Sequence, residues 1–137
     1  MKKLFLLLTL IVCSTGFGQS DSFNLVFDVT SSNPKAHETT IRHLNFMLEN
    51  EPNSKMDIVI YSGSLDMVVD NSSTVREEIL KLSKNENVTF KVCSTTMKRN
   101  NVDESMIISG VEIVKNPLRE IFNRQQEGWG YIKETNN

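Results

Sequence analysis

Short apolar runs alternate with helix-like segments along most of the chain, and this alternation constrains the fold more than any other feature. The runs cover residues 23–29, 56–61, 88–93 and 111–114. Consecutive apolar positions are typical of a strand that is covered on both faces. Residues 129–133, which follow the last helix-like segment, are expected to add a fifth strand.

Two of the helix-like segments begin with the same Asn-Pro pair. Asn33-Pro34 and Asn116-Pro117 each place a good N-cap residue before a proline, which suits the first helical turn. The first helix is expected to end at Pro52-Asn53 and to bury His37, Ile41, Leu44 and Leu48. The second is expected to end at Gly128 and to bury Leu118, Ile121 and Phe122.

Weaker signals mark the remaining elements. Thr74 with Glu77 three residues later has the pattern of a capping box, and it predicts a helix that buries Val75, Ile79 and Leu82. Ser62-Gly63-Ser64 is interpreted as a turn that closes the second strand. One or two short helices are expected between Thr95 and Ile108, with Asn101 as a cap.

Alternating strands and helices predict an α/β fold. We expect a three-layer α/β/α sandwich around a mostly parallel five-stranded sheet, built as a single domain from residues 19–137. Ligand-binding and catalytic groups of such sheets collect at the carboxyl ends of the strands. Here those ends fall at residues 28–32, 62–66 and 93–98.

The N-terminus has the pattern of an export signal. Lys2 and Lys3 precede an apolar stretch at residues 4–12, and Gly16-Phe17-Gly18 is typical of a cleavage site. The apolar stretch is too short to span a membrane, since a spanning helix needs roughly 20 residues. We therefore expect residues 1–18 to be removed and the mature protein to be periplasmic or secreted, without a membrane anchor.

Removal of the signal leaves a single cysteine. Cys13 lies within the segment that is cleaved; a lipid-modified Cys13 is the alternative, although bulky Val12 does not suit the processing site. Cys93 then has no disulfide partner. Loss of Lys2 and Lys3 also leaves 13 basic against 17 acidic groups. A net charge of that sign repels a phosphate backbone, so nucleic acid is not an expected partner.

Cys93 is the main candidate for chemistry. It ends an apolar strand and precedes a polar, basic segment that is expected to begin a helix. Helix N-H groups and nearby cations both stabilise a thiolate over a thiol, and a reactive Cys93 needs both effects together. The alternative is an inert packing residue, because free cysteines are often buried. The residues expected to stabilise the thiolate are Ser94, Thr95, Thr96, Lys98 and Arg99.

The other polar residues near strand ends give a looser set. Asp28, Thr30, His37, Ser62 and Gly63 are candidates for the wall of a pocket. Asp28 is more readily explained as a cap of the turn after the first strand. His37 is expected to be a hydrogen-bonded packing residue and His43 to face solvent. The two histidines are six residues apart, which does not suit a helical metal pair, so no metal site is expected.

With these residues in place, the chain resembles the DsrE/DsrF-like (YchN-like) family of sulfur-relay proteins over most of residues 23–133. The resemblance is carried by Val26-Phe27-Asp28-Val29, by Phe90-Lys91-Val92-Cys93 with Thr96-Met97-Lys98-Arg99, and by Gln126-Glu127-Gly128-Trp129-Gly130-Tyr131-Ile132-Lys133. It implies a homo- or hetero-oligomer in which Cys93 carries a persulfide between sulfur donor and acceptor proteins. No metal or organic cofactor is implied beyond that covalent sulfur.

One feature departs from the family. Its relay roles are cytoplasmic, whereas this chain carries an export signal, so transfer-RNA thiolation is not expected. Two hypotheses follow from the sequence. The first is an exported persulfide carrier or sulfurtransferase-type thiol protein that acts through an exposed, acidic Cys93. The second is a non-catalytic oligomeric module that keeps the fold and binds a small ligand or a partner segment.

Overall fold

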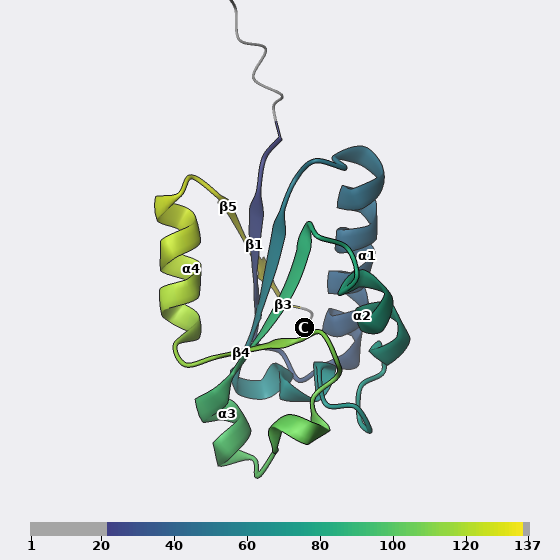
Figure 1. Cartoon of the computed structure of the whole chain (residues 1–137), viewed down its shortest axis with the longest axis vertical. Coiled ribbons are helices and arrows are strands. Elements are labelled where there is room, and N and C mark those ends of the chain that lie inside the picture. The colour runs from purple at the N-terminus through teal and green to yellow at the C-terminus, as the bar shows by residue number, and fades with distance from the viewer. Residues whose placement is uncertain (1–21, 136–137) are drawn as a thin grey trace, which may run out of the picture.

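The computed structural model describes residues 22–135 and contains five strands in one sheet (Figure 1). All neighbouring strands are parallel, in the order β4-β3-β2-β1-β5. The predicted five-stranded parallel sheet is therefore confirmed. The strands are β1 (Leu25–Val29), β2 (Met56–Ile60), β3 (Val88–Cys93), β4 (Glu112–Val114) and β5 (Gly130–Glu134).

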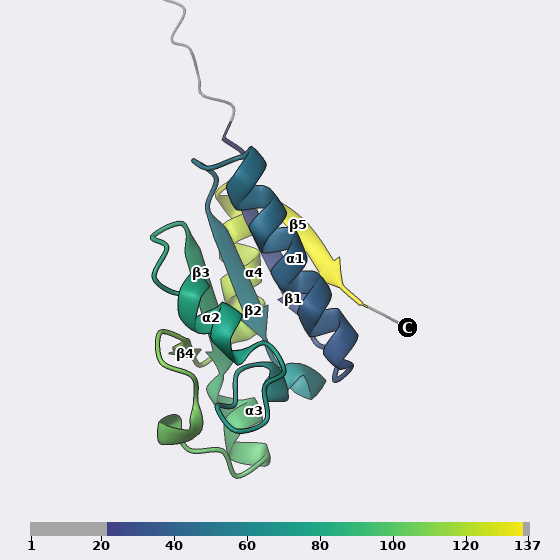
Figure 2. The same cartoon turned by 90° about the vertical axis from the view of Figure 1, so that its right-hand side faces the viewer.

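Helices cover both faces of the sheet. Helices α1 (Pro34–Asn50) and α2 (Arg76–Leu82) lie on one face, and α4 (Pro117–Gln126) lies alone on the other (Figures 1 and 2). Strands β1 to β4 proceed toward one edge and β5 returns to the opposite edge, so right-handed crossovers place α4 opposite the first two helices. The three-layer α/β/α sandwich expected from the sequence is confirmed.

The main hydrophobic core lies between the sheet and α1 with α2. Alternate strand residues point into it, among them Phe27, Ile58 and Phe90, which are fully buried. On α1 the buried residues include Ile41 and Leu44, at the helical spacing that the sequence predicted. Side chains of the intervening strand residues, Cys93 among them, therefore point to the face that α4 covers.

The core under α4 is much smaller and is supplemented by buried charges. Its buried apolar residues are Val26, Val59 and Ile121. Beside them, Lys91 Nζ lies 2.8 Å from Asp57 Oδ2 and 2.9 Å from Glu120 Oε2. Arg124 Nε on α4 lies 2.6 Å from the same Asp57 oxygen. Helix α4 is thus attached to the sheet by a few apolar contacts and an ion-pair network.

The two Asn-Pro pairs begin helices, as the sequence predicted. Asn33 Oδ1 accepts a hydrogen bond from Lys35 N at 3.0 Å, and Asn116 Oδ1 accepts one from Arg119 N at 3.0 Å. The predicted capping box at Thr74 is wrong. Helix α2 begins at Arg76 with Val75 as its N-cap and no side-chain cap, so Thr74 lies outside the helix.

Two other local expectations are corrected. Ser62-Gly63-Ser64 is not a simple turn; it begins a 3-10 helix, η1 (Ser62–Met67). Asn101 does not cap a helix but follows α3 (Ser94–Arg99) with φ of 54°, a left-handed conformation that asparagine tolerates. The next short helix, η2 (Glu104–Met106), is capped by Asp103.

The burial predicted for α4 is partly wrong. Ile121 is buried, but Leu118 is 63% exposed and Phe122 is 50% exposed. The reason is that α4 rests on a sheet face occupied by Lys91 and Asp57, so the helix turns Glu120 and Arg124 toward the sheet. Across residues 22–135 no helix has the length and apolar character needed to cross a membrane.

Candidate functional site

Cys93 occupies the junction between β3 and α3. It is the last residue of the strand and the N-cap of the helix, with an extended backbone (φ −74°, ψ 120°). Val92 points into the main core, so Cys93 points to the opposite face, toward the start of α4. The thiol therefore lies at the carboxyl edge of the sheet, where the sequence placed it.

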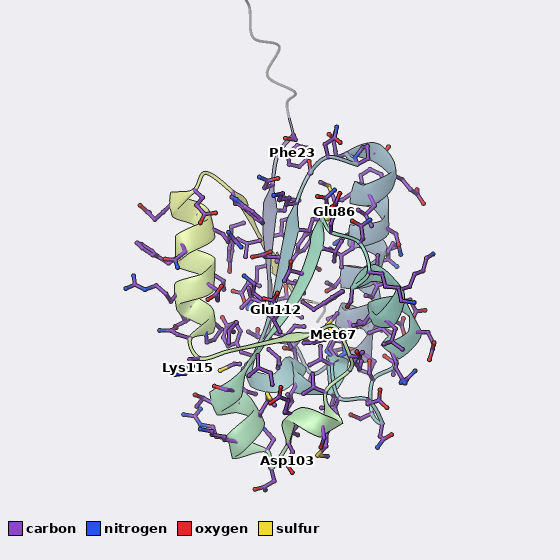
Figure 3. All side chains as sticks on the ribbon, viewed as in Figure 1. Phe23, Met67, Glu86, Asp103, Glu112 and Lys115 are labelled. Carbon is purple, nitrogen blue, oxygen red and sulfur yellow. The ribbon has the colours of Figure 1, made fainter. Side chains whose placement is uncertain are left out.

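A pocket of about 370 Å³ opens beside the thiol. Its walls come from the carboxyl ends of β2, β3 and β4 and from the beginnings of α3 and α4. Figure 3 shows Lys115 where β4 leads into α4, next to the end of the molecule that carries α3. The lining residues are Tyr61, Ser62, Cys93, Thr95, Thr96, Arg99, Lys115, Asn116, Pro117 and Leu118.

The expectation of an exposed thiol is wrong, because Cys93 is recessed, whereas the pKa of its thiol is lowered as expected. Only 5% of Cys93 is exposed to solvent, although it forms part of the pocket wall. Burial raises the pKa of Cys93, but hydrogen bonds from the backbone and side chain of Thr96 and of Thr95 together lower it below its ordinary value. The side chain makes no capping hydrogen bond to α3. The lowering therefore reflects bonds that a deprotonated sulfur would accept.

Thr96 connects the thiol to the end of β2. Its Oγ1 accepts a hydrogen bond from the backbone N–H of Ser62 at 3.2 Å. Ser62 has φ of 59°, a left-handed conformation that L-residues adopt at a cost. Ser64, two residues further along the chain, donates a hydrogen bond from Oγ to Val29 O at 2.6 Å. The first turn of η1 is thus fixed against the strand ends, and it holds the Thr96 hydroxyl in place.

The candidate thiolate-stabilising residues are distributed unevenly. Thr95, Thr96 and Arg99 line the pocket, whereas Ser94 and Lys98 are not among its lining residues. The lowered pKa of Cys93 arises from the two threonines and not from Lys98 or Arg99. The hydroxyl and amide groups of the first helical turn are thus the stabilising groups.

Sequence reasoning missed half of this pocket. Lys115 and Asn116 follow β4, Pro117 and Leu118 begin α4, and Tyr61 ends the second apolar run. A usable signal was present, because Lys115 and Asn116 directly follow the fourth predicted strand. The same rule that selected the carboxyl ends of the first three strands applies to that one.

Asp28 belongs to a second polar cluster on the same face of the sheet. Tyr131 donates a hydrogen bond to Asp28 Oδ2 at 2.6 Å, and Lys133 Nζ lies 3.0 Å from Asp28 Oδ1 and 2.7 Å from Thr30 Oγ1. Asp28 thus binds side chains of β5 instead of capping the turn after β1, which corrects the expectation. Asp28 and Thr30 do not line the Cys93 pocket.

Tyr61 lies between this cluster and the pocket. Burial, the charge of Asp28 and a hydrogen bond to Asp28 raise the pKa of Tyr61 to about 12. Burial and the hydrogen bond and charge of Asp28 raise the pKa of Tyr131, on the other side of that carboxylate, to about 12 as well. The ammonium group of Lys133 lies 5.8 Å from the centroid of the Tyr61 ring. Burial and Asp28 therefore extend the pH range over which both phenols stay protonated, and Asp28 holds Tyr61 in one wall of the pocket.

The remaining candidates have structural surroundings. His37 is buried, and its Nε2 hydrogen-bonds Ser31 O at 2.8 Å, in agreement with a packing role. A Cβ on Gly63 would lie 2.9 Å from Thr30 O, so this position accommodates only glycine without a shift of backbone. His43 is exposed and lies 2.6 Å from the buried carboxylate of Glu134. Neither His37 nor Gly63 lines the Cys93 pocket.

The described part of the chain contains no group of three or more His, Cys, Asp or Glu residues that could hold a metal ion. What the Cys93 pocket offers is a recessed thiol with a lowered pKa, hydroxyl and amide donors, and two cationic side chains. Such a set is suited to nucleophilic chemistry of the thiolate at sulfur.

No model of a known protein family matches the chain, and no curated protein matches it. Solved structures do. The protein of unknown function MTH1491 from Methanobacterium thermoautotrophicum is 22% identical with a TM-score of 0.75, over 82% of this chain and 99% of that one. The YchN protein of E. coli is 16% identical with a TM-score of 0.67, over 82% and 97%.

A third match has the same character. The conserved protein of unknown function BT1422 from Bacteroides thetaiotaomicron is 17% identical with a TM-score of 0.64, and the alignment covers 80% of this chain and 93% of that one. At these identities the matches establish the fold. The likeness to YchN expected from the sequence is therefore confirmed at the level of the fold.

Proposed function

We propose that this chain is a sulfur-carrying thiol protein that holds a persulfide on Cys93. The observation that supports the proposal is the lowered pKa of Cys93 in a pocket at the carboxyl edge of the sheet. A thiolate is the form of cysteine that attacks sulfur, and its attack is fastest when the thiol pKa lies near ambient pH.

The proposed reaction moves one sulfur atom from a donor to Cys93 and then from Cys93 to an acceptor. The Cys93 thiolate attacks the outer sulfur of a donor persulfide, the new S–S bond forms at Sγ, and the donor leaves as a thiolate with the electron pair of the broken bond. An acceptor thiolate then attacks the terminal sulfur on Cys93 and regenerates the Cys93 thiolate. No electrons are gained or lost overall, so no external oxidant is required.

Intact mass after incubation with a persulfide donor tests this function. We expect the protein to gain the mass of one sulfur atom, to lose it on addition of a thiol acceptor, and to gain nothing as Cys93→Ser. Retention of the native mass by the wild-type protein would contradict the proposal. Cys93→Ala is the second variant, because it removes the thiol without adding a hydroxyl to a buried position.

The burial of Cys93 favours a second candidate. With only 5% of its surface exposed, the thiol could serve packing alone, and the pocket would then hold a small ligand or a partner segment without chemistry. In that case Cys93→Ser leaves binding unchanged and no sulfur adduct forms. The mass measurement therefore separates the two candidates.

The proposal also includes export of the protein and its assembly into a homo-oligomer. Residues 1–18, which lie outside the described residues, would be a cleaved signal, and the mature protein would act in the periplasm or outside the cell with exported donor and acceptor partners. The exposed Leu118 and Phe122 on α4 offer an apolar surface for a homo-oligomer. Fractionation of expressing cells and mass analysis of the mature N-terminus test the export.

A further inference from the structure

The charge of the Cys93 pocket differs in sign from that of the whole chain. The protein has a formal net charge of −2, with 17 acidic residues. Yet none of the residues that line the pocket is Asp or Glu, and two of them, Arg99 and Lys115, are cationic. Two cationic side chains without a lining carboxylate concentrate positive potential at this opening of an acidic protein.

The two cations are not engaged elsewhere. Neither Arg99 nor Lys115 forms an ion pair or a side-chain hydrogen bond with any residue in the range 22–135. By contrast, Lys91, Arg124 and Lys133 on the same side of the sheet all bind carboxylates. The charges of Arg99 and Lys115 are therefore available to a ligand.

The start of α4 adds neutral donor groups to the pocket. Asn116 is the N-cap of α4, so this helix begins at the pocket with its N–H groups. The hydroxyls of Thr95 and Thr96 are engaged with the sulfur of Cys93. The two cations and the N-terminus of α4 thus favour a negative ligand, and no lining carboxylate opposes it.

The size of the pocket limits what can bind. A volume of about 370 Å³ is near the lower end of the range for small-molecule sites, roughly 300–1,000 Å³. The thiol is recessed in the wall of this pocket and does not project from the protein surface. A compact anion fits these dimensions better than a folded protein surface does.

From these observations we propose that the Cys93 pocket selects small sulfur compounds that carry a carboxylate or sulfonate, with Arg99 and Lys115 binding the anionic group. This inference rests on the proposed function and names the class of its donor or acceptor. In such a persulfide the anionic group is held by the two cations while its outer sulfur reaches Sγ of Cys93. The departing thiol takes its carboxylate or sulfonate with it.

Two reagents of nearly equal size test the charge preference without any sulfur transfer. Iodoacetate and iodoacetamide alkylate the same thiolate and release iodide, but only the first is an anion. We expect the ratio of their rate constants, iodoacetate over iodoacetamide, to be higher for Cys93 than for N-acetylcysteinamide. The excess should decrease with added salt, because ions screen the attraction.

Substitution of Arg99 and Lys115 tests whether these two side chains cause the preference for iodoacetate. Arg99→Gln and Lys115→Gln are each expected to lower the ratio about fivefold, as expected for one unit charge at a few ångströms in a solvated site. Lys81→Gln is the matched control, because it removes one positive charge from α2, on the opposite face of the sheet. Its ratio should equal that of the wild type. Circular dichroism of each variant checks the fold.

A second reagent pair covers sulfonates and attack at sulfur. The 2-sulfonatoethyl and 2-trimethylammonioethyl methanethiosulfonates both form a mixed disulfide with Cys93 and release methanesulfinate. We expect the sulfonate to react faster, relative to the same reagents on N-acetylcysteinamide. A carboxylate preference without a sulfonate preference, or the reverse, would overturn the shared anionic chemistry.

Further outcomes distinguish the anion preference of the pocket from the proposed sulfur transfer. A ratio at or below that of the free thiol overturns the proposal, and so does an elevated ratio that persists in the double variant without Arg99 and Lys115. Persulfide transfer without charge preference leaves the proposed function standing and removes this inference. An elevated ratio without persulfide transfer supports the anion preference and contradicts the proposed function.

Discussion

Thr96 Oγ1 lies 3.2 Å from the backbone nitrogen of Ser62 and also contributes to lowering the pKa of Cys93. One hydroxyl therefore joins the end of β2 to the thiol at the end of β3. Because a hydroxyl can accept one hydrogen bond while donating another, Thr96 can receive the Ser62 amide and still stabilise the thiolate. The acidity of Cys93 depends on how two neighbouring strand ends are joined.

Thr96→Val tests this relationship. Valine keeps the shape of threonine but lacks the hydroxyl, so the thiolate loses one hydrogen bond and the pKa of Cys93 should rise. The Ser62 amide also loses its acceptor, which should cost about 1 kcal/mol of stability. The pH dependence of iodoacetamide alkylation measures the pKa. Thr89→Val, the same substitution near the other end of β3, is the control and should leave the midpoint unchanged.

The position of Cys93 was predictable because it depends on local rules. An apolar run that ends in Cys93, followed by a helix start, places the thiol at the carboxyl edge of a parallel sheet. The Asn33 and Asn116 caps were predictable for the same reason, since capping uses residues within one turn. What brings Lys115 next to Cys93 is the pairing of β3 with β4, and that pairing is not local.

The orientation of α4 could not be predicted from its own sequence. Its apolar residues, Leu118, Ile121 and Phe122, have helical spacing, yet only Ile121 faces the sheet. The deciding residues lie on other elements. Lys91 and Asp57 occupy the facing strands, and they draw Glu120 and Arg124 inward. A helix rule that assumes an apolar sheet face fails where that face carries charges.

Asp28→Asn should change the titration of both tyrosines. Tyr61 and Tyr131 are the only tyrosines of the chain, and each has a pKa raised to about 12 by burial and by Asp28. Loss of the charge should shift tyrosinate absorbance toward lower pH, nearer the free value of about 10. The variant Asp66→Asn removes an exposed carboxylate and is the control. An unchanged absorbance curve in Asp28→Asn would contradict the assigned role.

The same shifts predict loss of stability in alkali. A folded pKa above the unfolded one means that the folded state holds the proton more tightly. The contribution of Tyr61 and Tyr131 is therefore complete below pH ~10, the unfolded value, and is lost as the pH rises through about 12. Urea unfolding of the wild type between pH ~10 and about 12 should show a decline in the free energy of unfolding. The decline should be smaller in Asp28→Asn.

Lys91→Met should weaken the attachment of α4. The ammonium group of Lys91 is buried and pairs with Asp57 and Glu120, so its removal leaves Asp57 with Arg124 alone and Glu120 without this partner. Breaking a buried ion pair on one side costs about 3 kcal/mol or more. Urea unfolding measures the loss, and hydrogen exchange should locate it in α4. Lys81→Met on α2 should leave both measurements unchanged.

The outer face of α4 carries two exposed apolar side chains. Leu118 and Phe122 are four residues apart on one side of the helix, 63% and 50% exposed, and Leu118 also lines the Cys93 pocket. If this face joins two copies of the chain, Leu118→Gln and Phe122→Gln should each weaken association about tenfold, equivalent to about 1.4 kcal/mol. Sedimentation equilibrium measures the dissociation constant. Phe46→Gln is the matched control, because Phe46 is 61% exposed on α1, across the sheet from α4. An oligomer that Phe46→Gln disrupts and the α4 variants leave intact would place the interface on α1 instead.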